Sequence, residues 1–180
     1  MRIYIVQPDV NKYRGLYYTD SKDVVEFNRR FNGTPMKNTW NLQDKFEFVS
    51  LRLPKGDVVG LSSHIPVFGA RAVELLGDLL EGNGELLPIT VGGVDYFVFN
   101  VTRVIDALDE ANSEVDRFES GEIFDVDRYS FFPEPLEDAT VFKIPHAVLQ
   151  DVFVTNPFVE RVQEAKLKGF KFRMVWSSAG

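Results

Sequence analysis

Gly92 and Gly93 are the residues that most constrain the fold of this chain, because they separate two apolar segments of strand length. Two consecutive glycines can both adopt positive φ, as the tightest two-residue link between antiparallel strands requires. The flanking residues 86–91 and 94–101 are rich in branched and aromatic side chains, which favour strands. We therefore predict a β-hairpin formed by residues 86–91 and 94–101.

Two further segments have the periodicity of amphipathic helices. Residues 66–81 place their apolar side chains on one stripe, and Gly82 follows as a left-handed cap would; the stripe comprises Ala70, Val73, Leu76, Leu79 and Leu80. The second helix is predicted to begin at Asn156, which would cap it, with Pro157 in its first turn and Gly169 at its end. Its predicted inward side chains are Val159, Val162 and Leu167.

The other segments favour strands, which we predict at residues 2–6, 45–53, 128–132, 140–144, 152–155 and 170–176. Residues 104–111 are predicted as a short helix or turn, and a short helix starting at Asp20 or Ser21 would bury Val24, Val25 and Phe27. Strands and helices do not alternate as a parallel wound sheet requires. The fold class we predict is α+β, with a mostly antiparallel sheet and two principal helices in one domain, residues 1–180. The sequence pattern assigns secondary structure least clearly in residues 1–45.

Composition supports a globular protein without covalent cross-links. Hydrophobic residues make up 44% of the 180 residues and charged residues 26%, and 16 residues are Phe. The chain has no cysteine, which excludes disulfides, thiolate metal sites and a cysteine nucleophile. The first residues lack the apolar segment of a secretory signal, and no run reaches the roughly 18 apolar residues of a membrane span. We expect a cytoplasmic protein that binds no membrane.

The negative charge of the chain is concentrated in residues 106–127. This segment contains one base, Arg117, and nine acids, so its balance is -8, while the remaining 18 acids and 19 bases sum to +1. The acids are Asp106, Asp109, Glu110, Glu114, Asp116, Glu119, Glu122, Asp125 and Asp127. A concentrated negative field attracts cationic partners and repels the phosphates of nucleic acids, so we expect a protein partner and no nucleic acid.

Four explanations of the acidic segment remain open. Calcium loops need ligands at alternating positions with a central glycine, whereas Ala107 and Leu108 interrupt the first acids. Asp106 and Glu110 would share a helix face and could serve acid–base catalysis, although the residues show nothing that separates their pKa values. The acids could also simply cap and solvate a helix and a loop. The last explanation is a binding surface for a basic protein.

Other catalytic patterns are weak. Ser62, Ser63 and His64 lie in sequence beside each other, but His64 replaces the glycine of a nucleophile elbow, and side chains so close on a turn rarely face one another. His146, the other histidine, has no partner at the spacing of a zinc-binding helix. No glycine-rich phosphate loop is present. We expect no metal and no cofactor.

Four segments resemble an immunity-protein family of bacterial polymorphic toxin systems, whose members have often been catalogued as a domain of unknown function. They are YIVQPD (4–9), RAVELLGDLLEGNGELLPI (71–89), YFVFNVTRVIDALDEANSE (96–114) and residues 158–176, which end in GFKFRMVW. The third is the most specific. The resemblance implies a small cytoplasmic protein without catalysis that binds and neutralises a cognate toxin made by the same cell.

The resemblance also bears on which acids would contact the toxin. Asp106 and Asp109 fall in the segment most similar to the family, where toxin-specific contacts would be surprising. We therefore assign the partner contacts to Glu114, Asp116, Glu119, Glu122 and Asp125. Nuclease domains are commonly basic, so we infer a basic, nuclease-type toxin. Two other functions remain open: a small-molecule enzyme using Asp106, Glu110 and His64, and a scaffold protein for another partner.

Overall fold

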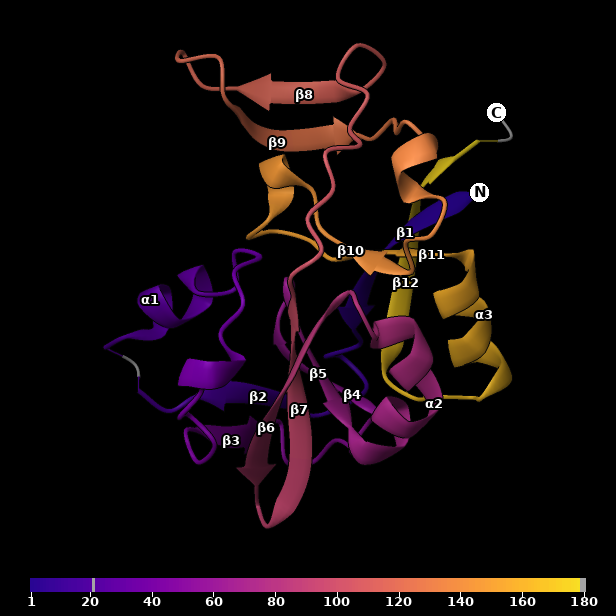
Figure 1. Ribbon diagram of the computed structural model, residues 1–180. Helices are drawn as coiled ribbons and strands as arrows, with labels where there is room; N and C mark the ends of the chain where they lie inside the picture. The colour runs from indigo at the N-terminus through magenta and orange to yellow at the C-terminus, as the bar shows by residue number, and fades with distance from the viewer. Residues whose placement is uncertain (21, 179–180) are drawn as a thin grey trace.

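The computed structural model describes residues 1–20 and 22–178, which form three β-sheets and three α-helices (Figure 1). The six-stranded sheet has the order β3–β2–β4–β5–β7–β6 and comprises β2 (Gly15–Tyr18), β3 (Phe46–Val49), β4 (Val58–Ser62), β5 (Ile65–Gly69), β6 (Gly84–Val91) and β7 (Val94–Val101). The four-stranded sheet has the order β10–β11–β1–β12 and comprises β1 (Arg2–Pro8), β10 (Val141–Phe142), β11 (Phe153–Thr155) and β12 (Phe170–Ser177). A separate hairpin pairs β8 (Glu114–Arg117) with β9 (Ile123–Arg128).

Antiparallel pairing dominates, as predicted for an α+β fold. Among the described strands only β2 and β4 pair in parallel, through Gly15 and Gly60. The predicted hairpin is confirmed: Val91 faces Val94, and Gly92 and Gly93 have φ values of 57° and 74°. The predicted strand at the end of the chain is β12, which pairs with β1.

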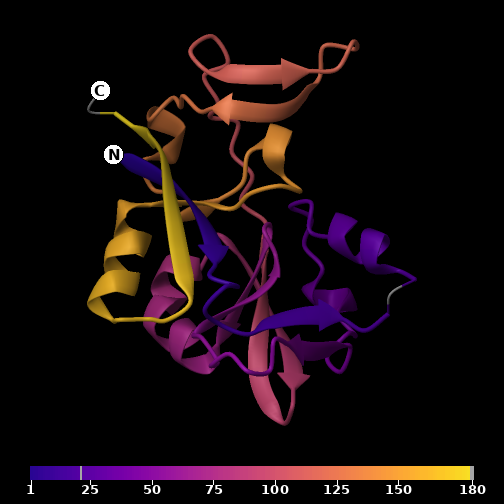
Figure 2. The same ribbon diagram turned by 180° about the vertical axis from the view of Figure 1, so that it is seen from behind.

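The helices are α1 (Val24–Arg29), α2 (Ala70–Leu80) and α3 (Asn156–Glu164), and the short 3-10 helices are η1 (Lys37–Thr39), η2 (Glu134–Leu136) and η3 (Pro145–Ala147). Helices α2 and α3 lie side by side (Figures 1 and 2). Leu76 and Leu80 of α2 share a buried cluster with Phe158 and Val162 of α3 and with residues of both large sheets. Burial of this cluster joins the two sheets into one core. No helix in the described ranges is long and apolar enough to cross a bilayer.

The first predicted helix needed correction at its N-terminus, whereas α3 begins at Asn156 as predicted. Residues 65–69 form β5 rather than the start of α2, because Val67 and its neighbours pair with β7 inside the six-stranded sheet. The buried stripe of α2 is Ala72, Leu76 and Leu80, and Ala70 is exposed. Asn156 does not cap α3, because Thr155 occupies the N-cap position and Asn156 is the first helical residue; its Oδ1 instead accepts a hydrogen bond from the backbone N–H of Arg2 at 2.7 Å. Helix α3 ends at Glu164, before Gly169.

The loops also differ from the predictions. Strand β3 stops at Val49, since Ser50 has a φ of 57°, and Leu51 is exposed. Residues 104–111 form no helix and end in a turn, the other predicted alternative. Of the predicted strand 128–132, only Arg128 belongs to a strand, β9, and Phe131 forms an isolated bridge with Leu108. The region between them contains the β8–β9 hairpin, which the sequence pattern missed.

The predicted short helix corresponds to α1, which begins at Val24; the proposed start at Ser21 lies outside the described residues. Only Phe27 of its three predicted apolar residues is buried, because its ring stacks on Tyr18 with centroids 4.4 Å apart. Val24 and Val25 are exposed instead.

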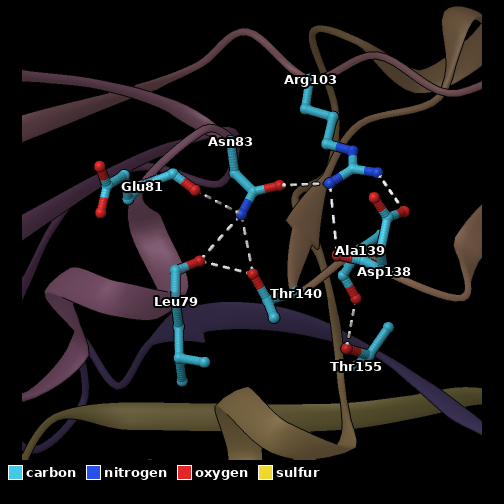
Figure 3. Close-up of polar contacts among 8 residues, drawn as sticks. All are labelled: Leu79, Glu81, Asn83, Arg103, Asp138, Ala139, Thr140 and Thr155. Atoms are coloured by element: carbon cyan, nitrogen blue, oxygen red, sulfur yellow. Dashed lines mark hydrogen bonds and ion pairs between the residues drawn. The ribbon is translucent and has the colours of Figure 1, made fainter.

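Asn83, just after α2, connects three parts of the fold (Figure 3). Its side-chain N–H groups donate to the carbonyl of Leu79 at 2.9 Å and to the hydroxyl of Thr140 at 2.8 Å, and its Oδ1 accepts from Arg103 at 3.2 Å. Arg103 also pairs with Asp138 at 2.5 Å. The side chain of Asn83 thus ties the end of α2 to the segments that follow β7 and precede β10.

Replacement of Asn83 by alanine should lower the free energy of unfolding by about 2 kcal/mol, because it leaves buried polar groups without partners. Urea denaturation followed by circular dichroism would measure the loss. Asn41→Ala is the matched control, since Asn41 is exposed, and we expect a change below about 0.5 kcal/mol there. Equal effects of the two substitutions would contradict a structural role for Asn83.

Candidate partner-binding surface

Residues 114–127 of the acidic segment form most of the β8–β9 hairpin, which projects at one end of the molecule (Figures 1 and 2). Ile123 and Val126 are buried on the inner side of the hairpin, and Val115 is half-buried there. They share a hydrophobic cluster with the rings of Tyr129 and Phe131. The hairpin is therefore held by its inner side, while its outer side faces solvent.

The outer face follows from the strand pairing, because alternate residues of a strand point to opposite sides. Val115 lies opposite Val126 on the inner face. Asp116 therefore lies opposite Asp125 on the outer face, and both are exposed. Glu114 lies opposite Arg128, also exposed, and the two form a salt bridge of 2.9 Å.

The structure therefore brings three of the five predicted contact residues onto one face, namely Glu114, Asp116 and Asp125. The other two, Glu119 and Glu122, are exposed in the turn that joins the strands. Within residues 1–20 and 22–178, none of Asp116, Glu119, Glu122 and Asp125 forms a salt bridge. Like charges directly opposite each other destabilise a strand pair. The Asp116–Asp125 pair is therefore unfavourable in the isolated protein.

The remaining acids of the segment have different environments. Glu110 pairs with Arg117 at 2.5 Å, and this contact lowers the pKa of the Glu110 carboxyl. Asp109 shapes a turn: its carboxylate accepts hydrogen bonds from the backbone and side chain of Asn112. This arrangement suits a structural role for Asp109, although it caps no helix. Asp106 and Asp127 are exposed.

The residues suggested for a small-molecule enzyme do not form a common site. His64 is buried and lies beside a hollow of about 310 Å³ that is lined by Val24, Val25, Asn28, Arg29, His64 and Leu149. Neither Asp106 nor Glu110 lines that hollow. In the part of the chain that the structure describes, no three His, Asp or Glu side chains cluster closely enough to hold a metal ion.

Ser62 and His64 do face one another, contrary to the expectation from their spacing. The Ser62 hydroxyl lies 2.9 Å from Nδ1 of His64, and Nε2 of His64 lies 3.2 Å from the carbonyl of Asn28. A carbonyl only accepts, so Nε2 carries the proton and Nδ1 accepts from the hydroxyl. Burial lowers the pKa of His64, which keeps the ring neutral. The pair holds α1 against the turn between β4 and β5.

Sequence reasoning missed two aromatic residues of the hairpin. Phe118 and Phe124 are 57% and 40% exposed, and their ring centroids are 4.7 Å apart. Aromatic side chains are enriched among the residues that dominate binding energy in protein interfaces. The signal was present as two phenylalanines within a stretch that is otherwise almost entirely polar or charged, on either side of Gly121.

The protein therefore has an α+β fold, and its candidate site is an exposed hairpin that carries acidic and aromatic side chains. Residues 90–177, just under half of the chain, match the model of the immunity protein family Imm11. The match contains the whole β8–β9 hairpin and confirms the family resemblance seen in the sequence. Similarity to this family suggests a toxin-neutralising role, and immunity proteins are generally not enzymes. No curated protein matches the chain.

Proposed function

We propose that this protein binds and neutralises a cognate toxin in the cytoplasm, without catalysis, through the outer face of the β8–β9 hairpin. The observation that carries the proposal is the direct opposition of Asp116 and Asp125, together with the absence of a salt bridge to either among the described residues. A hairpin that had only to be stable would gain from a cation at either position. Cations on the partner would relieve the repulsion on binding.

The contact residues proposed for the toxin are Glu114, Asp116, Glu119, Glu122 and Asp125. Their negative field would accelerate the encounter with a basic partner and orient it. A nuclease-type toxin would present such a surface where it binds phosphate groups. The acids would then occupy its substrate groove and prevent nucleic acid from entering.

Co-purification with the product of the adjacent gene tests the function itself. We expect that product to be toxic when expressed alone and harmless when co-expressed with this protein. We also expect the two purified proteins to form a stable complex. A neighbouring product that is harmless alone, or that does not bind, would contradict the proposal.

The double substitution Asp116→Asn and Asp125→Asn tests the acidic face. It removes the repulsion between the strands, so the free energy of unfolding should rise by about 0.5 kcal/mol. Association with the toxin should nevertheless slow by about 10-fold and become less sensitive to salt. Stopped-flow fluorescence over a series of salt concentrations would measure both changes.

The matched control is Asp44→Asn with Glu74→Gln, which removes the same charge from exposed positions outside the hairpin. Its association rate should stay within about 2-fold of the wild-type rate, because more distant charges are screened. If the hairpin variant associates as fast as the control, the acids do not belong to the interface.

A further inference from the structure

The turn of the β8–β9 hairpin extends over the same side of the molecule as α1, and the segment around η3 lies between them (Figures 1 and 2). Exposed apolar side chains follow one another along this side. We name them the apolar track, and its members are Phe118, Phe124, Leu149, Val25 and Val24.

Contacts between neighbouring segments place the three parts of the apolar track next to one another. The rings of Phe118 and Phe124 touch, and the side chain of Gln150 donates to the backbone carbonyl of Phe124 at 2.8 Å. Leu149 precedes Gln150 and lines the 310 Å³ hollow together with Val24 and Val25. The track therefore runs from the hairpin turn across the η3 segment to α1.

The backbone of β9 accounts for the outward position of Phe124. The pairing shifts between Asp116 and Arg117, where the partner residue changes from Asp125 to Ile123, so Phe124 is the extra residue of a bulge. Ile123 and Val126 are buried on either side of it. A bulge re-aims a side chain. Here it leaves Phe124 outside the core, against the ring of Phe118.

Exposed apolar side chains scattered singly are normal, but contiguous ones mark interaction sites. Val25 is 61% exposed and Leu149 is 40% exposed, so the far end of the track is as accessible as the aromatic end. Glu119, Glu122 and Asp125 lie beside the two rings in sequence and are exposed, and Arg117, the base next to Phe118, is paired with Glu110. Negative charge therefore predominates at the aromatic end. A basic protein with apolar side chains of its own is complementary to both features.

We propose that the apolar track is the anchoring part of the toxin interface, and that an apolar side chain of the basic toxin enters the hollow between α1 and Leu149. This inference rests on the proposed toxin-binding function. The acids govern the rate of encounter, whereas burial of the track governs the lifetime of the complex. The interface extends to Val24 and Val25, outside the region that matches the immunity protein family.

Surface plasmon resonance with the full chain and the purified product of the adjacent toxin gene tests the proposal. The variant Phe124→Ser with Leu149→Ser should dissociate about 100-fold faster than the wild type. Its association rate should change by less than about 3-fold, and its salt dependence should stay unchanged. The single substitution Val25→Ser should accelerate dissociation by about 5-fold, because it removes one wall of the hollow.

The control variant is Leu51→Ser with Met174→Ser, which changes two exposed apolar residues away from the track. It should dissociate at the wild-type rate, and circular dichroism should show that all variants are folded. If the wild type binds and the track variants dissociate no faster than the control, the anchoring role is wrong while neutralisation stands. If the wild type does not bind, this inference falls together with the proposed function.

Discussion

Replacement of Lys143 by methionine should raise the free energy of unfolding at pH 7 by about 2 kcal/mol. The Lys143 side chain has no exposed surface, and its Nζ donates to the carbonyl of Phe31 at 2.6 Å. No carboxylate in the described ranges lies within salt-bridge distance of it. The free-energy cost of desolvating the ammonium group is therefore poorly offset by this one hydrogen bond. Methionine fills a similar volume without that cost.

The pH dependence of the free energy of unfolding would identify burial of the Lys143 ammonium group as the cause of the difference. Burial lowers the pKa of Lys143 from 10.5 to about 7, so between these values the folded protein has released a proton that the unfolded chain still binds. Wild-type stability should therefore rise as the pH increases above 7, and the penalty should be fully present below 7. The methionine variant should lack this rise.

Urea denaturation between pH 6 and pH 9.5 would compare the two proteins. The upper limit avoids ionisation of Tyr129 in the unfolded chain. In the folded protein its pKa is raised, chiefly by burial. Lys171→Met, at an exposed position of β12, is the matched control and should keep the wild-type rise. A methionine variant that is less stable than the wild type at pH 7 would show that the bond to Phe31 outweighs the desolvation.

Replacement of Phe131 by alanine should lower the free energy of unfolding by about 4 kcal/mol. Phe131 is buried, and its ring contacts those of Tyr129, Phe142, Phe153 and Trp176, with centroids 5.6 to 6.3 Å apart. These rings come from the end of the acidic hairpin and from the four-stranded sheet. Loss of Phe131 would open a cavity where the hairpin meets the core.

The neighbouring residue supplies the control, since Phe132 is 50% exposed. Phe132→Ala should change the free energy of unfolding by less than about 1 kcal/mol. Both values can be measured by urea denaturation. Similar losses at the two positions would mean that the cluster around Phe131 does not anchor the hairpin.

Local chemistry made several elements predictable from the sequence. The Gly92–Gly93 link identified its hairpin because glycine adopts two consecutive positive φ values without the steric strain that a side chain would cause. The inward positions Val159 and Val162 of α3 were correct because an amphipathic helix shows its buried side as a period, and Leu167 is buried too, although it lies beyond the end of the helix. The concentration of acids was also visible, since charge can be counted without a structure.

The β8–β9 hairpin could not be predicted with the same reasoning. Its sequence lacks the regular alternation of apolar and polar residues that identifies a strand. Only Val115, Ile123 and Val126 face inward, and two bulges interrupt the pairing. The three predicted contact residues Glu114, Asp116 and Asp125 were named without any knowledge that they share a face. That fact depends on cross-strand register, which tertiary packing sets.

By itself, the sequence determined a mostly antiparallel α+β chain, an acidic segment and a family resemblance, because these depend on neighbouring residues or on composition. Only the tertiary structure decided that Asp116 faces Asp125, that Lys143 is buried with no salt-bridge partner among the residues the structure describes, and that Leu149 lies beside Val24 and Val25. Each of these relationships joins residues that are separate along the chain. Long-range packing determines such distances, and no local pattern encodes them.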